Sequence, residues 1–103
     1  MAGDGLHGFA LRHEGELVGI THYLFHESAW TPAPLCYLQD LFIDPAARGT
    51  GGGRALIEAV AEAARTAGSP RLYWMTQTHN ELARQLYDRL AKHNGFIRYD
   101  YTL

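Results

Sequence analysis

The stretch Arg48-Gly49-Thr50-Gly51-Gly52-Gly53-Arg54 decides how this chain folds. It joins an apolar run, Leu38 to Ile43, to an Ala-rich segment with helical periodicity, Ala55 to Ala67. A glycine-dense turn between a strand and a helix leaves backbone N–H groups free and lets a ligand approach them closely. These amides and the positive end of the helix dipole attract anions, and two arginines add charge. The stretch therefore predicts a strand–turn–helix unit that binds a pyrophosphate.

Length and composition limit the class of protein. The 103 residues are sized for a single domain, 1–103. A net charge of −2 offers no positive surplus for binding nucleic acid. No stretch is long and apolar enough for a bilayer span, and the first eight residues lack the regions of a signal peptide, so we expect no membrane partner. The single cysteine, Cys36, cannot form an internal disulfide, which favours a reduced cytoplasmic compartment.

Three strands are expected before the glycine turn. Phe9–His13 and Leu17–Phe25 flank Glu14-Gly15-Glu16, a pattern typical of a hairpin. His26–Pro34 contains two prolines and predicts a loop. Leu35–Ile43 is nearly continuous in apolar residues, as expected of a central strand covered on both faces.

Two helices and two strands are expected after the turn. The Ala55–Ala67 helix should bury Leu56, Val60, Ala63 and Ala67. Arg71–Thr76 predicts a short strand, Glu81–His93 an amphipathic helix with Leu82, Leu86 and Leu90 stacked, and Phe96–Leu103 a last strand. Either Asn80 or a Thr78-x-x-Glu81 capping box would begin the second helix. The fold class is mixed α/β, in the order β-β-β-α-β-α-β, with an antiparallel start and a parallel crossover.

The combination of three motifs is more specific than the glycine turn alone. A Gly-x-x-x-x-Gly-Lys-Ser/Thr loop is excluded because Arg54-Ala55 stands at its Lys-Ser/Thr positions, and a dinucleotide fingerprint lacks its acidic residue. The motifs present are Leu41-Phe42-Ile43-Asp44-Pro45, Arg48-x-x-Gly51-x-Gly53 and Asn80-x-x-Ala83-x-x-Leu86-Tyr87.

With these motifs the chain resembles the GNAT superfamily of acyl-CoA N-acyltransferases. Arg48-x-x-Gly51-x-Gly53 is similar to the family's pyrophosphate loop, and Asn80 to Tyr87 to its second CoA motif. The resemblance runs from about Leu17 to the C-terminus, and Tyr37 to Phe42 most resembles the histone, polyamine and diamine acetyltransferase branch. It implies an N-acetyltransferase that uses acetyl-CoA and no metal. The implied acceptor is a primary amine on a polyamine, a diamine, a protein lysine or a protein N-terminus.

The resemblance also implies where acetyl-CoA binds. It would lie in a split between Leu35–Ile43 and Arg71–Thr76, with backbone groups of Leu41 and Ile43 on the pantetheine arm. Amides from Gly49 to Arg54 would hold the pyrophosphate, and Asn80 would contact the CoA arm. The residues implied to bind acetyl-CoA are Leu41, Phe42, Ile43, Arg48, Gly49, Thr50, Gly51, Gly52, Gly53, Arg54, Asn80 and Tyr87.

By the same resemblance, two residues carry the chemistry. Tyr87 would donate a proton to the leaving CoA thiolate. Related diamine acetyltransferases place Glu beside Asp where this chain has Gln39-Asp40. Because Gln39 cannot accept a proton, Asp40 is the implied base, directly or through water, with His79 as the weaker alternative.

Purely structural interpretations stay open beside these roles. The glycine turn could bind no ligand, Tyr87 could be a core aromatic, Asp40 could bind only a backbone amide or an arginine, and Asn80 could only cap its helix. Cys36 is expected to be a small buried apolar residue. His22 and His26 would lie roughly 13 Å apart on a strand, too far for one metal ion.

Family members open with a strand and one or two helices that precede the Phe9–His13 strand, and this chain starts too late to contain them. We expect apolar sheet surface to be exposed, which favours a homo-oligomer, in the simplest case a homodimer, or a partner segment. The alternative function is a non-catalytic or truncated acyl-CoA-binding domain that acts as a sensor or requires a partner chain. Tyr87 to Gly95 is also longer than usual, which predicts about one extra helical turn.

Overall fold

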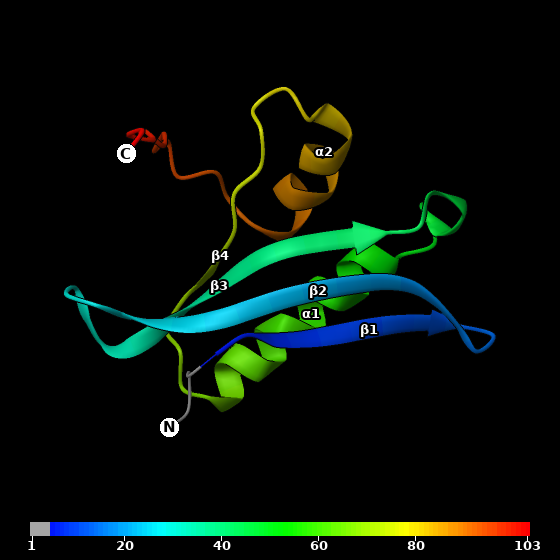
Figure 1. Ribbon diagram of the computed structural model, residues 1–103, viewed down its shortest axis with the longest axis horizontal. Helices are drawn as coiled ribbons and strands as arrows, with labels where there is room; N and C mark the ends of the chain where they lie inside the picture. The colour runs from blue at the N-terminus through cyan, green and yellow to red at the C-terminus, as the bar shows by residue number, and fades with distance from the viewer. Residues whose placement is uncertain (1–4) are drawn as a thin grey trace.

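A four-stranded sheet and two helices make up the computed structural model, which describes residues 5–103 (Figure 1). The elements are β1 (His7–His13), β2 (Glu16–Ser28), β3 (Thr31–Ile43), a 3-10 turn η1 (Pro45–Ala47), α1 (Gly52–Thr66), β4 (Leu72–Tyr73) and α2 (Glu81–Leu90). Strands β1, β2 and β3 are antiparallel neighbours, and β4 runs parallel to β3. The mixed α/β class and the parallel crossover are confirmed.

The β1–β2 hairpin forms at the expected place. Glu14 and Gly15 both have positive φ, 51° and 84°. A two-residue turn of this kind matches the right-handed twist of the flanking strands, so the strands pair closely up to His13 and Glu16.

The predicted loop over His26–Pro34 is wrong. Strand β2 continues to Ser28 and β3 already begins at Thr31, so the two form one long hairpin. The prolines at 32 and 34 are tolerated because β4 pairs only with Cys36 and Tyr37, which leaves the earlier part of β3 with a free edge.

Helix α1 lies against one face of the sheet (Figure 1). The core there consists of Tyr23, Cys36, Leu38, Ile57, Val60 and Ala64. Leu56 and Val60 are buried as expected, but Ile57 and Ala64 complete the buried stripe, while Ala63 is half-buried and Ala67 is exposed. The stripe is therefore centred on Val60 and is wider than one row of residues.

Cys36 is fully buried, which confirms its predicted place in the core. Burial raises the pKa of its thiol to about 11. The thiol therefore stays protonated near neutral pH, and protonated thiols are poor nucleophiles.

The C-terminal part departs most from expectation. Helix α2 ends at Leu90 because Ala91 is extended, so neither the continuation to His93 nor the extra turn is present. Leu86 and Leu90 pack on the core, but Leu82 is 74% exposed. No strand forms over Phe96–Leu103. The neighbouring β4 has only two paired residues, Leu72 and Tyr73, which is a short ladder for a further strand to join.

Within residues 5–103, no helix is long and apolar enough to cross a membrane.

Candidate functional site

A cleft of about 600 Å³ opens where the end of β3, the glycine turn, the start of α1 and helix α2 meet. Its lining residues are Leu41, Phe42, Ile43, Ala47, Arg48, Gly49, Gly51, Gly52, Gly53, Arg54, Asn80, Leu82, Ala83, Leu86, Tyr87 and Arg89. All the residues that the sequence assigned to acetyl-CoA binding are among them except Thr50. The structure therefore brings the three sequence motifs to one concave surface.

The glycine turn leaves the start of α1 open to this cleft. Gly49 and Gly51 have φ of 83° and 87°, and a Cβ on either would meet nothing within 4 Å. Gly51 is the N-cap of α1 and supplies no side-chain cap, and the first turn contains no acidic residue. The first amides of α1, from Gly52 to Arg54, therefore have neither a capping oxygen nor a carboxylate beside them. An anion could satisfy them.

Two polar side chains hold the turn in shape. The Thr50 hydroxyl donates to the Ala47 carbonyl oxygen at 2.5 Å, and Arg48 Nε donates to the Ile43 carbonyl oxygen at 3.2 Å. Thr50 therefore has a local structural contact instead of a place in the cleft lining. Arg54 lies on the solvated side of α1, where its Nε is 3.2 Å from Glu58 Oε1.

The next two glycines are needed for packing. A Cβ on Gly52 would lie 2.6 Å from Leu11 Cδ2, and one on Gly53 would lie 3.2 Å from Leu86 Cδ2. The start of α1 consequently approaches β1 and α2 more closely than a larger residue would allow. This approach brings the free amides against the cleft.

Helix α2 and its N-cap contribute both polar and apolar residues to the cleft. Asn80 is its N-cap, with its side-chain oxygen accepting from the Ala83 amide at 3.4 Å, which decides between the two caps expected from the sequence. Tyr87 is half-buried, and its ring meets Trp74 edge-on at a centroid distance of 5.5 Å. Burial raises the pKa of Tyr87, so its phenol remains protonated at neutral pH and can donate a proton.

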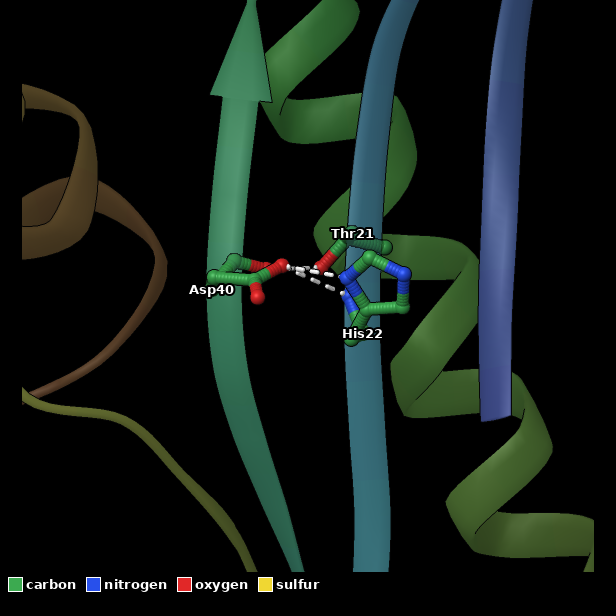
Figure 2. Close-up of polar contacts among 3 residues, drawn as sticks. All are labelled: Thr21, His22 and Asp40. Carbon is green, nitrogen blue, oxygen red and sulfur yellow. Dashed lines mark hydrogen bonds and ion pairs between the residues drawn. The ribbon is translucent and has the colours of Figure 1, made fainter. Parts of the chain in front are cut away.

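Asp40 precedes the cleft residue Leu41 on β3 and contacts residues of β2 (Figure 2). Its Oδ1 accepts from the His22 amide at 3.1 Å and lies 2.8 Å from His22 Nδ1. The Thr21 hydroxyl donates to the Asp40 carbonyl oxygen at 2.6 Å. His22 faces away from α1, since the next residue, Tyr23, is in the core, and the bulge at Gln39 sets Asp40 opposite His22 on the same face. His79 is exposed and does not line the cleft.

The sequence did not reveal the His22–Asp40 contact or the cleft residues Leu82 and Arg89. The register of β2 against β3 shifts between His22 and Tyr23, where Gln39 is the extra residue on β3, and again between His26 and Ser28. A bulge moves every pair beyond it by one residue, so the partner of His22 could not be counted from the turn. For Arg89, the spacing of three residues from Leu86 was the available signal.

Comparison with known proteins agrees with this geometry. The model of the acetyltransferase (GNAT) family matches residues 2–91, which is most of the chain. The chain belongs to the acetyltransferase (GNAT) family.

Individual relatives are similar over most of this chain. It is 36% identical over 85 residues to the D-amino-acid N-acetyltransferase HPA3 of Saccharomyces cerevisiae, which covers 82% of this chain and 53% of that protein. It is 32% identical over 99 residues to a thialysine N-epsilon-acetyltransferase of Caenorhabditis elegans, covering 91% and 61%. The chain thus spans between half and two thirds of the length of these relatives.

A solved structure shows the same fold. An aminoglycoside N-acetyltransferase in complex with CoA superposes with a TM-score of 0.86 over 97% of this chain and 77% of that chain. The sequence identity is 19%, so the likeness concerns the fold alone.

Proposed function

We propose that this chain carries the acetyl-CoA-binding and catalytic part of an N-acetyltransferase that transfers an acetyl group from acetyl-CoA to a primary amine. The observation that carries the proposal is the single cleft that joins β3, the uncapped start of α1 and Tyr87 on α2. Membership of the GNAT family supports it.

The cleft fits the two chemically distinct parts of coenzyme A. The diphosphate would bind the amides from Gly49 to Arg54, where the helix dipole is unopposed by any acidic residue in the first turn. The pantetheine arm would run along Leu41 and Ile43 on β3. Because the cleft also has apolar walls at Leu82 and Leu86, it suits a ligand that is part chain and part anion.

The reaction would be direct attack of the amine on the thioester carbon. An alkylammonium with a pKa of about 10.4 must first lose a proton, which passes to Asp40 and then to water. The C–N bond forms, the C–S bond breaks, and the CoA thiolate takes a proton from the Tyr87 phenol. Tyr87 is restored by the second proton that the nitrogen releases. The net products are an amide, CoA and one proton.

The acceptor we propose is a cationic primary amine on a polyamine, a diamine, a protein lysine or a protein N-terminus. Its support is the partly exposed Asp40 carboxylate next to the cleft residue Leu41, which would attract an ammonium group. The names of the two relatives also denote amine acceptors, D-amino acids and the ε-amine of thialysine. We further propose that the chain acts as a homodimer in the cytoplasm.

The test is release of thiol from acetyl-CoA in the presence of a panel of amines, with mass detection of the acetylated product. Acetylation of at least one amine is expected. Binding of acetyl-CoA without transfer to any amine would instead favour the non-catalytic acyl-CoA-binding domain.

A further inference from the structure

We propose that His22 is a positioning residue for Asp40, and that it fixes one carboxylate oxygen so that the other receives the acceptor amine. The inference rests on the proposed acetyl transfer and deepens it, since it assigns a residue to acceptor binding. Neither the sequence motifs nor the family comparison points to His22.

Two donors from one residue converge on a single atom. The His22 amide and Nδ1 lie 3.1 and 2.8 Å from Asp40 Oδ1. The amide belongs to β2 and cannot turn away, so it fixes the carboxylate plane together with the ring. Within the described residues 5–103, Oδ2 receives no such bond and remains available to a ligand.

The backbone around the pair is fixed as well. The Thr21 hydroxyl, which is fully buried, donates to the Asp40 carbonyl oxygen at 2.6 Å. The bulge at Gln39 brings Asp40 opposite His22 in the register. Asp40 is therefore held through both its main chain and its side chain. Such contacts would keep the carboxylate in one orientation toward the acceptor amine.

Strand β1 makes room for the imidazole. Gly8 is the partner of His22 in the β1–β2 register, and a Cβ there would lie 3.3 Å from His22 Cδ2 and 3.8 Å from Nε2. The ring thus extends from Asp40 toward β1, with its second nitrogen away from the carboxylate (Figure 2).

The chemistry of the pair suits a cationic acceptor. A neutral imidazole that faces a carboxylate through Nδ1 must carry its proton on that nitrogen, so it donates to Asp40 Oδ1. The His22 and Asp40 side chains are 34% and 49% exposed, so a substrate can reach them. The ammonium group of the acceptor would give a proton to Asp40 Oδ2, so that its N–H bond breaks and an O–H bond forms. The lone pair freed on the nitrogen would then attack the thioester carbon.

Kinetics on matched variants test this role, with 1,4-diaminobutane and thialysine as acceptors. His22→Leu should lower kcat/KM for the amine about 10-fold, mainly through KM, and leave the KM for acetyl-CoA unchanged. His22→Asn, which keeps an N–H near the Nδ1 position, should recover most of the loss. His22→Leu combined with Asp40→Asn should be no worse than Asp40→Asn alone. The control is His26→Leu, since His26 contacts Tyr73 instead, at 2.7 Å, and should leave the amine KM unchanged.

Three results would overturn this role of His22. The losses of the two single variants could multiply in the double variant, His22→Leu could raise the KM for acetyl-CoA as much as the KM for the amine, or His22→Asn could fail to recover activity. A second readout needs no turnover. Imidazole ¹⁵N NMR should show the proton of neutral His22 on Nδ1, and Asp40→Asn should shift it toward Nε2. Added 1,4-diaminobutane should shift the His22 Nδ1 resonance of the wild type and leave that of Asp40→Asn in place. Identical spectra of the wild type and of Asp40→Asn would refute the contact between His22 and Asp40. Failure of the protein to bind acetyl-CoA would instead refute the proposed function, and the spectra would still report on the His22–Asp40 contact.

Discussion

Tyr87 is the side chain whose environment fits a proton donor best. Its ring packs against Trp74 and it lines the cleft. Phe in its place keeps the ring contact and removes only the hydroxyl. Tyr87→Phe should therefore lower kcat by roughly 10²–10⁴-fold, the usual contribution of a general acid, with little change in acetyl-CoA affinity. Steady-state kinetics and calorimetric titration measure the two quantities. Comparable losses in both would identify Tyr87 as a packing or binding residue.

At this scale, local spacing in the sequence predicted the residues whose place depends on a short stretch of chain. Gly49, Gly51 and Asn80 belong to turns and caps that a few neighbours determine, and each lies on the cleft. The contact of His22 with Asp40 depends on two register shifts in a long hairpin, which no local pattern encodes.

Among the elements, the turn that begins α1 can be tested against the turn that ends it. Gly51 and Gly68 have φ of 87° and 79°, and a Cβ on either would meet nothing within 4 Å. Alanine at either position should cost about 1 kcal/mol of stability through backbone strain. Gly51→Ala alone should also weaken acetyl-CoA binding, because relief of the strain turns the first amides of α1. Thermal unfolding and calorimetry follow the two effects. Equal affinities in the two variants would contradict the assignment of this turn.

Strands β2 and β3 show why the elements were predicted unevenly. Hydrophobic periodicity located α1, and the Glu14-Gly15-Glu16 turn located the β1–β2 hairpin, since both signals depend on nearby residues. The prolines at 32 and 34 indicated a loop, yet they lie in β3 where the strand has a free edge. Whether an edge is free is a property of the whole sheet.

For the whole molecule, burial of Cys36 predicts a loss of stability in alkali. Its thiol pKa is raised from 9.0 to about 11, so the unfolded chain releases this proton first as the pH rises. The contribution is complete below pH 9 and should be lost by pH 11, at about 2–3 kcal/mol of unfolding free energy. Denaturant unfolding of Cys36→Ala should show a smaller decline than the wild type over this window. Burial also raises the pKa of Tyr23 and Tyr73, which adds to the decline in both proteins, and the charge of the Cys36 thiolate raises both pKa values further in the wild type alone. If the unfolding free energies of the wild type and of Cys36→Ala fell in parallel with pH, the contribution of the Cys36 thiol would be refuted.

Exposed apolar side chains predict self-association. The large residues of the C-terminal segment, all more than 70% exposed, are Phe96, Ile97, Tyr99, Tyr101 and Leu103. Water-exposed apolar surface of this extent favours burial against another protein surface. Light scattering should give about twice the mass of one chain, and replacement of Tyr99 and Tyr101 by Ser should lower it. A monodisperse monomer would count against the homodimer.

The overall class could be predicted because the third expected strand opens a strand–helix–strand unit, and such a unit fixes the parallel crossover. The absence of a strand over residues 96–103 could not be predicted. These residues have the composition of a strand, but only the short β4 is available as a neighbour.

The central claim is that the first amides of α1 bind the diphosphate of acetyl-CoA. An NMR titration of the ¹⁵N-labelled protein with acetyl-CoA tests it most directly, with acetylpantetheine, which lacks the diphosphate, as the comparison. The amide resonances of Gly52, Gly53 and Arg54 should shift strongly and saturably with acetyl-CoA and stay nearly in place with acetylpantetheine. Unmoved amides at saturating acetyl-CoA would contradict the claim.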